Sequence, residues 1–214
     1  MIRFLDSLLP SWMHPRIVSI FILVSMLIGG LTPHLSAQNE PVTVSNTKFY
    51  SKEGSYDDYL FEIELTALAP TEASVNPKYL DNIEVEVIIG YPHPIKAGEF
   101  LFHKSTVAIA TMEVKQKRKI GFWLPYDIAQ RDNMNKEPEF WLINLSVDGS
   151  EIPLTGKNSR NRTSSNLTSK QAVDKMMSLA SSATEGVLLP GYLSGNGYRE
   201  RGRDRPPFIR IEEN

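Results

Sequence analysis

Between residues 42 and 154, apolar and polar residues alternate with a period of two, the pattern of half-buried β-strands. In residues 61–66 every second side chain is aromatic or aliphatic, and the side chains between them are carboxylates or a threonine. The apolar side chains therefore share one face, as an antiparallel sheet with one solvated face requires. The strands expected from this pattern are residues 42–49, 61–66, 83–89, 100–112, 119–124, 141–147 and 152–154.

Turn-forming residues separate these strands. The loop at residues 91–98 contains two prolines that cannot donate to a β-ladder, and Asp148-Gly149 predicts a tight hairpin. Residues 126–133 follow Pro125 and are expected to form a short helical turn. Short strands divided by turns, with no alternation of strands and helices, predict a mainly β fold, an antiparallel β-sandwich or a small barrel.

A hydrophobic segment near the N-terminus, residues 17–31, is fifteen residues long and carries no charge. Arg16 precedes it directly and Leu35-Ser36-Ala37 follows it, which is the order of a secretory signal. A membrane-spanning helix usually needs ~20 apolar residues, so cleavage after Ala37 is favoured. Leu35 is larger than the residue preferred at that site, and retention as a signal anchor is the alternative. We expect an exported protein, periplasmic or at the cell surface, tethered to the inner membrane if the signal stays.

The composition changes after the last expected strand. A stretch rich in Ser, Asn and Thr, almost without apolar residues, is typical of a linker. Thr168 and Gln171 then have the spacing of a helix capping box, and an apolar stripe follows them. The expected parts are a signal peptide or anchor (1–37), a β-sandwich domain (38–154), a linker (155–167), an amphipathic helix (168–186) and a flexible basic tail (187–214).

The formal net charge of −2 conceals an uneven distribution. Residues 38–154 contain 11 Lys and Arg against 18 Asp and Glu, a net of −7, whereas residues 155–214 contain 10 against 6, a net of +4. We expect an acidic body and a basic tail, which in an exported protein meets anionic lipid or an acidic partner rather than nucleic acid. The residues expected to contact a partner are Met176, Leu179, Arg199, Arg201, Arg203 and Arg205.

Residues for catalysis or metal binding do not occur in a recognisable arrangement. The chain has no cysteine, which excludes disulfides, thiolate metal sites and cysteine nucleophiles. His93 and His103 lack metal-ligand spacing, and Ser194 is not in a nucleophile elbow. Carboxylate pairs such as Glu62 and Glu64 lie on one solvated strand face rather than across a cleft. We expect no enzyme and no cofactor.

Aromatic residues leave a second class of function open. Trp and Tyr side chains stack against sugar rings, so an exposed and coplanar set would make the domain a carbohydrate-binding module. An inward orientation of these rings would argue against that alternative. The candidate stacking residues are Tyr91, Trp123, Tyr126 and Trp141.

Three stretches resemble a family of exported β-domain proteins of Verrucomicrobia-type bacteria, found beside genes for type IV pilus-like assembly. The stretches are residues 79–85, residues 122–128 with Arg131 and Asp132, and residues 147–149. The resemblance covers about residues 42–154. It implies a non-enzymatic envelope protein that binds other proteins in a pilus-like or secretion assembly, and it supplies no catalytic residue.

Overall fold

The computed structural model describes residues 40–50, 59–70, 76–134, 136–154, 161–193 and 206–209. The chain divides into two units, residues 1–38 and 39–214, and every described residue belongs to the second unit. The hydrophobic segment at residues 17–31 and the four tail arginines lie outside the described residues. Within the described part, no helix has the length and apolar character needed to cross a membrane.

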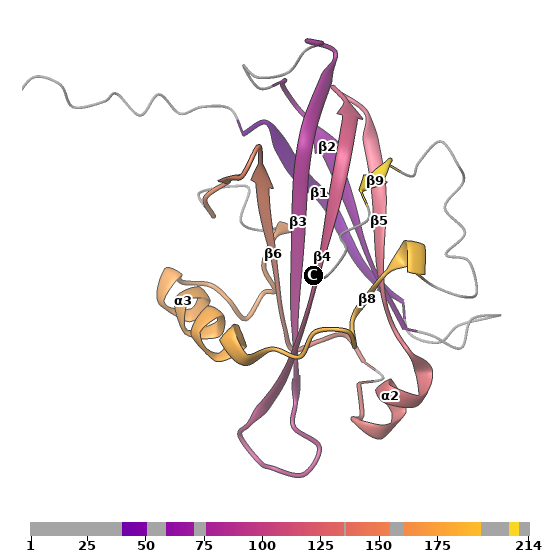
Figure 1. The fold of residues 1–214 in the computed structure, drawn as a ribbon. Helices are drawn as coiled ribbons and strands as arrows, with labels where there is room; N and C mark the ends of the chain where they lie inside the picture. Colours follow the sequence, from indigo (N-terminus) through magenta and orange to yellow (C-terminus); the bar gives the residue numbers. More distant parts are fainter. Residues whose placement is uncertain are drawn as a thin grey trace, which may run out of the picture. The chain divides into compact units, whose positions relative to one another are not determined.

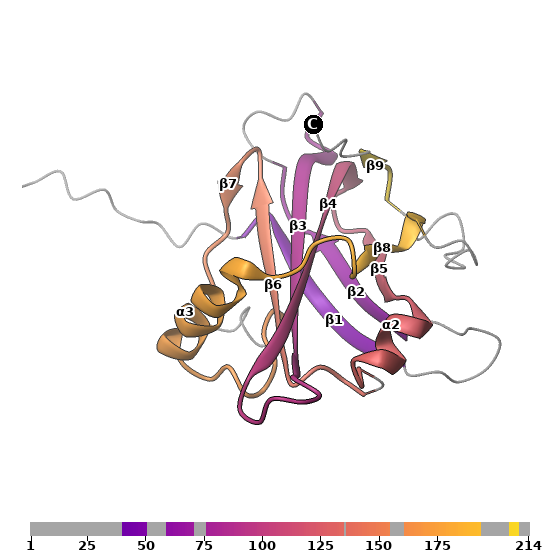
Figure 2. The same cartoon turned by 60° about the horizontal axis from the view of Figure 1, so that its bottom comes forward.

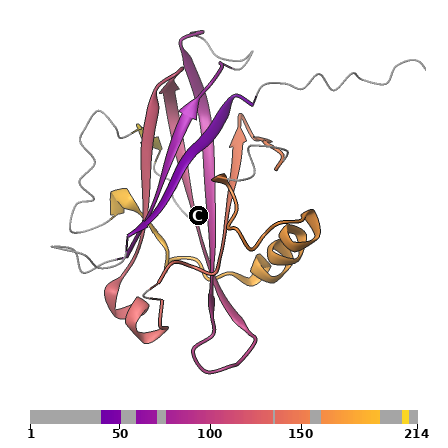
Figure 3. The ribbon, with the colours of Figure 1, turned by 180° about the vertical axis from the view of Figure 1, so that it is seen from behind.

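Two antiparallel sheets face each other (Figures 1 and 3). Sheet A has the strand order β1-β2-β5-β8, and sheet B has the order β7-β6-β3-β4-β9. This architecture confirms the predicted mainly β sandwich. The strands are β1 (Val42–Tyr50), β2 (Tyr59–Ala67), β3 (Tyr79–Pro92), β4 (Phe100–Glu113), β5 (Lys117–Leu124), β6 (Phe140–Val147), β7 (Ser150–Glu151), β8 (Leu189–Pro190) and β9 (Phe208–Ile209).

The main core lies between the sheets and is built from the inward side chains of the alternating strands. Phe61 of sheet A meets Trp141 of sheet B with ring centroids 5.7 Å apart, which joins the two layers. Because burying one large apolar side chain contributes about 1.5–3 kcal/mol, this layer is the chief source of stability. The alternation seen in the sequence thus fixes which face of each sheet is internal.

The expected turns form where the sequence placed them. Helix α2 (Tyr126–Arg131) begins after Pro125. Asp148 and Gly149 have positive φ angles of 50° and 73°, and two such residues make the tight turn that matches the twist of a hairpin.

A second hydrophobic cluster lies on the outer face of sheet B. Ile88 of β3 and Leu142 of β6 are direct neighbours there. Helix α3 (Lys170–Leu179) and the 3-10 turn η2 (Ala180–Ser182) cover them with Met176 and Ala180, which are both buried. Met176 therefore packs on the protein's own sheet, which corrects its assignment as a partner contact. Leu179 remains 50% exposed.

The helix is shorter than predicted. Its N-cap is Ser169, whose hydroxyl oxygen accepts a hydrogen bond from the Ala172 N–H at 3.2 Å, rather than Thr168. Ser169 has the extended backbone that a cap requires, with φ −128° and ψ 154°. The α-helical part ends at Leu179, so the predicted range 168–186 is corrected to a helix of ten residues followed by a 3-10 turn.

Part of the predicted linker closes one side of the sandwich. Asn161 donates hydrogen bonds to the carbonyls of Val44 and Ser45 on β1, at 3.1 and 3.3 Å. On β6, the Ile143 N–H donates to the Arg162 carbonyl and the Ser164 N–H donates to the Trp141 carbonyl, at 2.7 and 2.9 Å. Residues 161–164 thus join the edge strand of sheet A to sheet B, which corrects the linker prediction for these residues.

Arg162 holds this segment in place. Its side chain is fully buried, and its guanidinium donates to the carbonyls of Ile143, Ile152 and Pro153 at 3.0, 2.9 and 3.1 Å. Burial lowers the pKa of Arg162 from its ordinary value, yet an arginine stays ionised in a protein. A buried cation is tolerated because its donors are satisfied by carbonyl dipoles.

Part of the predicted flexible tail closes the opposite side. The C-terminal strap, residues 183–193 and 206–209, pairs through Thr184 with Phe102 and Lys104 of β4. β8 then pairs with β5, and β9 pairs with β4 (Figure 2). The rings of Tyr192 and Phe208 lie 5.1 Å apart and connect these two contacts. The tail prediction is corrected for residues 187–193 and 206–209, because sheet edges with free backbone groups favour such pairing.

Replacing Arg162 with Ala should lower the free energy of unfolding by about 3 kcal/mol or more, since three carbonyls lose their donor. The control is Arg118→Ala, because Arg118 donates only to an exposed carbonyl on β5 and should change stability by less than about 0.5 kcal/mol. Urea unfolding curves of the two variants measure the difference, and equal midpoints would contradict the role given to Arg162.

Candidate functional site

The four aromatic residues considered for sugar stacking do not share a face. Tyr91 and Trp141 are buried in the main core, at 2% and 7% exposure, because they have the parity of the inward residues of β3 and β6. The Tyr91 hydroxyl donates to the Lys136 carbonyl at 3.0 Å, and burial raises its pKa. Tyr126 packs partly buried against the same core. The predicted platform is therefore not formed.

Trp123 instead belongs to a row of apolar side chains on the outer face of sheet A. Strand register places Tyr50 beside Leu60, Leu60 beside Trp123, and Trp123 beside Leu189. Tyr50 is 42% exposed and the other three side chains are half-buried. This apolar row crosses all four strands of the sheet.

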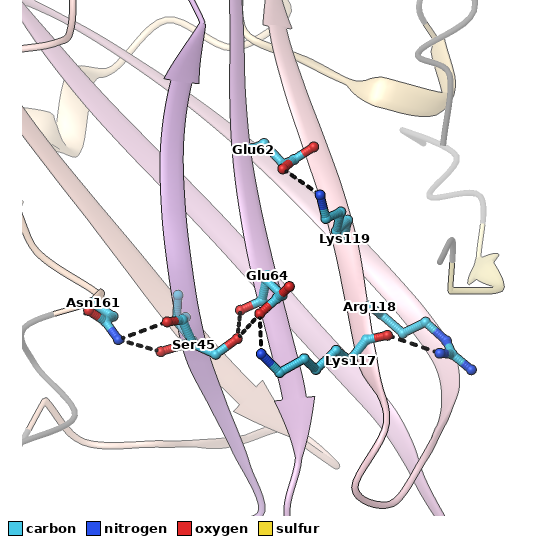
Figure 4. Close-up of polar contacts among 8 residues, drawn as sticks. Ser45, Glu62, Glu64, Lys117, Arg118, Lys119 and Asn161 are labelled. Atoms are coloured by element: carbon cyan, nitrogen blue, oxygen red, sulfur yellow. Dashed lines mark hydrogen bonds and ion pairs between the residues drawn. The ribbon is translucent and has the colours of Figure 1, made fainter. Parts of the chain in front are cut away.

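Charged residues occupy the rows next to the apolar row. Lys119 Nζ lies 3.2 Å from Glu62 Oε1, and Lys117 Nζ lies 2.8 Å from Glu64 Oε1 (Figure 4). The Ser45 hydroxyl also donates to Glu64 Oε1, at 2.6 Å. The hydrogen bonds from Lys117 and Ser45 lower the pKa of Glu64, and the hydrogen bond to Glu62 raises the pKa of Lys119. The carboxylates and ammonium groups are thus held as pairs across β1, β2 and β5.

The outer faces of the two sheets differ in what covers them. α3 and η2 pack over the apolar part of sheet B. In the described part of the chain no helix lies over sheet A, as the view from behind shows (Figure 3). The face with the apolar row is the candidate interaction face.

Two cavities lie beside β6 on the other layer, and α3 lines the first of them. The two cavities have volumes of about 660 and 880 Å³, and both have Thr163, Leu167 and Thr168 in their walls. Val173 and Met177 of α3 contribute apolar surface to the first cavity. Glu151 and Asp174 line the first cavity, and Glu137 and Glu139 line the second.

His103 is a buried titratable residue that sequence reasoning did not single out beyond excluding a metal site. It is 4% exposed, and neither ring nitrogen has a hydrogen-bond partner among the described residues. Burial lowers its pKa, the charge of Asp132 opposes that shift, and Arg131 adds to it. In the part of the chain described, no group of three or more His, Asp or Glu side chains could hold a metal ion.

Comparisons with known proteins place the fold but not the activity. No protein-family model matches the chain, and no curated protein is significantly similar to it. A crystal structure of a protein from Akkermansia muciniphila has a similar fold, with a TM-score of 0.58 and 15% identity over 79% of this chain and 93% of that chain. That organism is a Verrucomicrobium, which agrees with the bacterial group of the resemblance.

The extent of this match is informative. Residues 1–154 make up 154 of 214 positions, about 72% of the chain, and the match covers 79%. The similar fold therefore includes segments after Leu154, which the family resemblance left out.

Stability should fall as the pH is lowered from about 6.5, the ordinary pKa of histidine. The pKa of His103 is lower in the folded state, so the unfolded chain binds a proton first as the pH falls. The free energy of unfolding then decreases by up to about 1.4 kcal/mol for each pH unit. His103→Leu should remove this part of the pH dependence. Thermal unfolding of both proteins between pH 5 and 7 compares the slopes, and parallel curves would contradict the prediction.

Proposed function

We propose that this chain is an exported, non-enzymatic component of the bacterial envelope that binds another protein through the outer face of sheet A. The observation that carries the proposal is the apolar row Tyr50, Leu60, Trp123 and Leu189 beside paired charges. A pilus-like or secretion assembly is the finer part of the proposal, supported by the family resemblance.

The chemistry of the face is that of a protein interface. Such interfaces have a core enriched in aromatic residues, and a polar rim that excludes water from it. Tyr50 and Trp123 supply the aromatic groups, and the pairs Glu62–Lys119 and Glu64–Lys117 supply the rim. Because these charges already neutralise one another, docking does not require a partner of strong opposite charge.

The same geometry fits a sugar less well. Tyr50 and Trp123 are separated by strand β2, which places their strands about 9.6 Å apart, with Leu60 between them. A protein surface can contact all these side chains at once, whereas the buried Tyr91 and Trp141 add nothing to a stacking platform.

Tyr50→Asp should weaken binding of the partner at least about tenfold, because aromatic residues at the centre of an interface carry much of its binding energy. Capture of the partner from an envelope extract of the source bacterium should then be lost. Tyr79→Asp is the matched control, because Tyr79 is 36% exposed on β3 of the other sheet. The tagged full chain is the bait, and quantitative mass spectrometry identifies proteins lost only with Tyr50→Asp. If both variants capture the same proteins equally, this face is not the interface. Loss of binding on a glycan array with Tyr50→Asp alone would favour a sugar ligand instead.

Export is tested separately by N-terminal sequencing of the protein from fractionated cells. We expect the mature chain to begin at Gln38 and to be found outside the cytoplasm, since residues 17–31 have the features of a signal. An intact N-terminus in the membrane fraction would identify a signal anchor. Recovery only from the cytoplasm would contradict the proposal.

A further inference from the structure

The hairpin that joins β3 to β4 extends past the strand beside it (Figures 1 and 3). Phe140 is the first residue of β6, and its pair with Gly90 is the last one between β6 and β3 in this direction. β3 and β4 continue beyond it, up to Pro92 opposite Phe100. We call residues 93–99, which close the hairpin, the hairpin tip.

Ile95 lies in the hairpin tip with its side chain almost wholly in solvent. It is 87% exposed, and the next most exposed large apolar residue among those described is Leu193, at 55%. A single exposed apolar side chain is common on a protein surface and by itself indicates no function. Ile95 differs from such a residue in the arrangement of the backbone around it.

The backbone around Ile95 is satisfied within the tip, and Pro94 has no N–H that needs an acceptor. The N–H groups of Ile95 and Lys96 both donate to His93 Nδ1, each at 3.2 Å. The His93 N–H donates to the Glu99 carbonyl at 2.9 Å, and the Glu99 N–H donates to the Lys96 carbonyl at 3.2 Å. A donor that already has an acceptor loses little when water is removed from it. This backbone can therefore enter an apolar environment at low cost.

The tip is also held in one shape. Gly98 has a φ of 82°, the left-handed backbone that lets the chain turn back towards β4. Lys96 Nζ lies 3.3 Å from Glu99 Oε2 across the turn. At the base, the rings of Phe100 and Phe140 meet edge to face with centroids 4.9 Å apart, which braces the hairpin against β6. Because these contacts already restrict the backbone, binding through the tip costs less entropy than binding through a mobile loop.

A projecting tip with one apolar side chain fits an apolar pocket in another protein. Lys96 and Glu99 neutralise each other, so the pocket needs no strong charge of its own. A lipid bilayer is the other apolar environment that an exported protein meets. One side chain gives little affinity for a bilayer, since even one myristoyl chain binds only weakly and reversibly, and anionic lipid repels the Glu99 carboxylate. These features favour the protein pocket.

We propose that the hairpin tip is a second interaction surface, on which Ile95 inserts into an apolar pocket of a partner protein. His93 is a positioning residue, because its ring accepts the two N–H groups that set the shape of the tip. This surface goes beyond the proposed function, which concerns the outer face of sheet A, and it does not depend on that function.

Photo-cross-linking of the full chain in an envelope extract of the source bacterium tests the proposal. The photoreactive residue p-benzoylphenylalanine is placed at Ala97, which is exposed and two positions from Ile95. One protein should cross-link with wild type and with Ile95→Leu. The yield with Ile95→Asp should be at least about tenfold lower, as for a side chain at the centre of an interface. Leu193→Asp makes a matched change at another exposed apolar residue and should leave the yield unchanged.

His93→Leu separates an ordered tip from a merely apolar one. This variant keeps Ile95 but removes the acceptor of two N–H groups. The cross-linked protein is identified and purified, and calorimetry measures its affinity for each variant. Ile95→Asp should bind at least about tenfold more weakly, and His93→Leu at least about fivefold more weakly, the effect of one lost hydrogen bond. Equal affinity of His93→Leu and wild type would contradict the role of His93, and thermal unfolding confirms that each variant is folded.

Three outcomes would overturn the proposal. The first is a cross-link that is as strong with Ile95→Asp as with wild type, and the second is a wild type that cross-links to no protein. The third concerns lipid. Wild type and Ile95→Asp should bind equally to phosphatidylglycerol vesicles in a flotation assay, so weaker binding of the variant would assign the tip to the membrane.

Discussion

The contact of Arg162 with three main-chain carbonyls is the interaction on which the rest of the arrangement depends. The carbonyls belong to Ile143, Ile152 and Pro153, on β6 and just after β7, so one side chain joins residues that are 9 to 19 positions away. It fixes residues 161–164 between the edge of sheet A and β6, and the chain then leads directly into Ser169 and α3. The cover that α3 forms over sheet B starts from this point.

The strands and their inner faces were predictable because they follow from a local rule. A period of two sorts each strand into two faces, and Tyr91 and Trp141 obey it with Ile89 and Ile143. A stacking platform would have required Tyr91 and Trp141 to face outward, against the parity of their own strands. The burial of Arg162 does not follow from its local sequence, because an arginine within a stretch of Ser, Asn and Thr is expected to be exposed to solvent. The burial of Arg162 depends on carbonyl acceptors supplied by Ile143, Ile152 and Pro153. The apolar row depends on the register between neighbouring strands, which cannot be predicted from the sequence of one strand.

Each sheet has one outer face, and the chain treats the two differently. Sheet B has apolar residues on its outer face where Ile88 and Leu142 meet, and α3 covers them. Sheet A has an apolar row, and Glu62, Glu64 and their lysine partners border it on one side. One sandwich thus has two outer faces of different chemistry: a neutral face with aromatic groups on sheet A, and a helix-covered face on sheet B.

The closure of both sides of the sandwich by residues after Leu154 has a consequence for the order of events in the cell. Asn161 reaches back 117 positions to the β1 carbonyl of Val44, and β9 completes the edge of β4 from the far end of the chain. Contacts between residues so distant in sequence form slowly, and none can form while the later residues are still on the ribosome. The pairing of β1 to β6 therefore precedes the closure of the two sides, which waits for residues 161 and 209 to leave the ribosome.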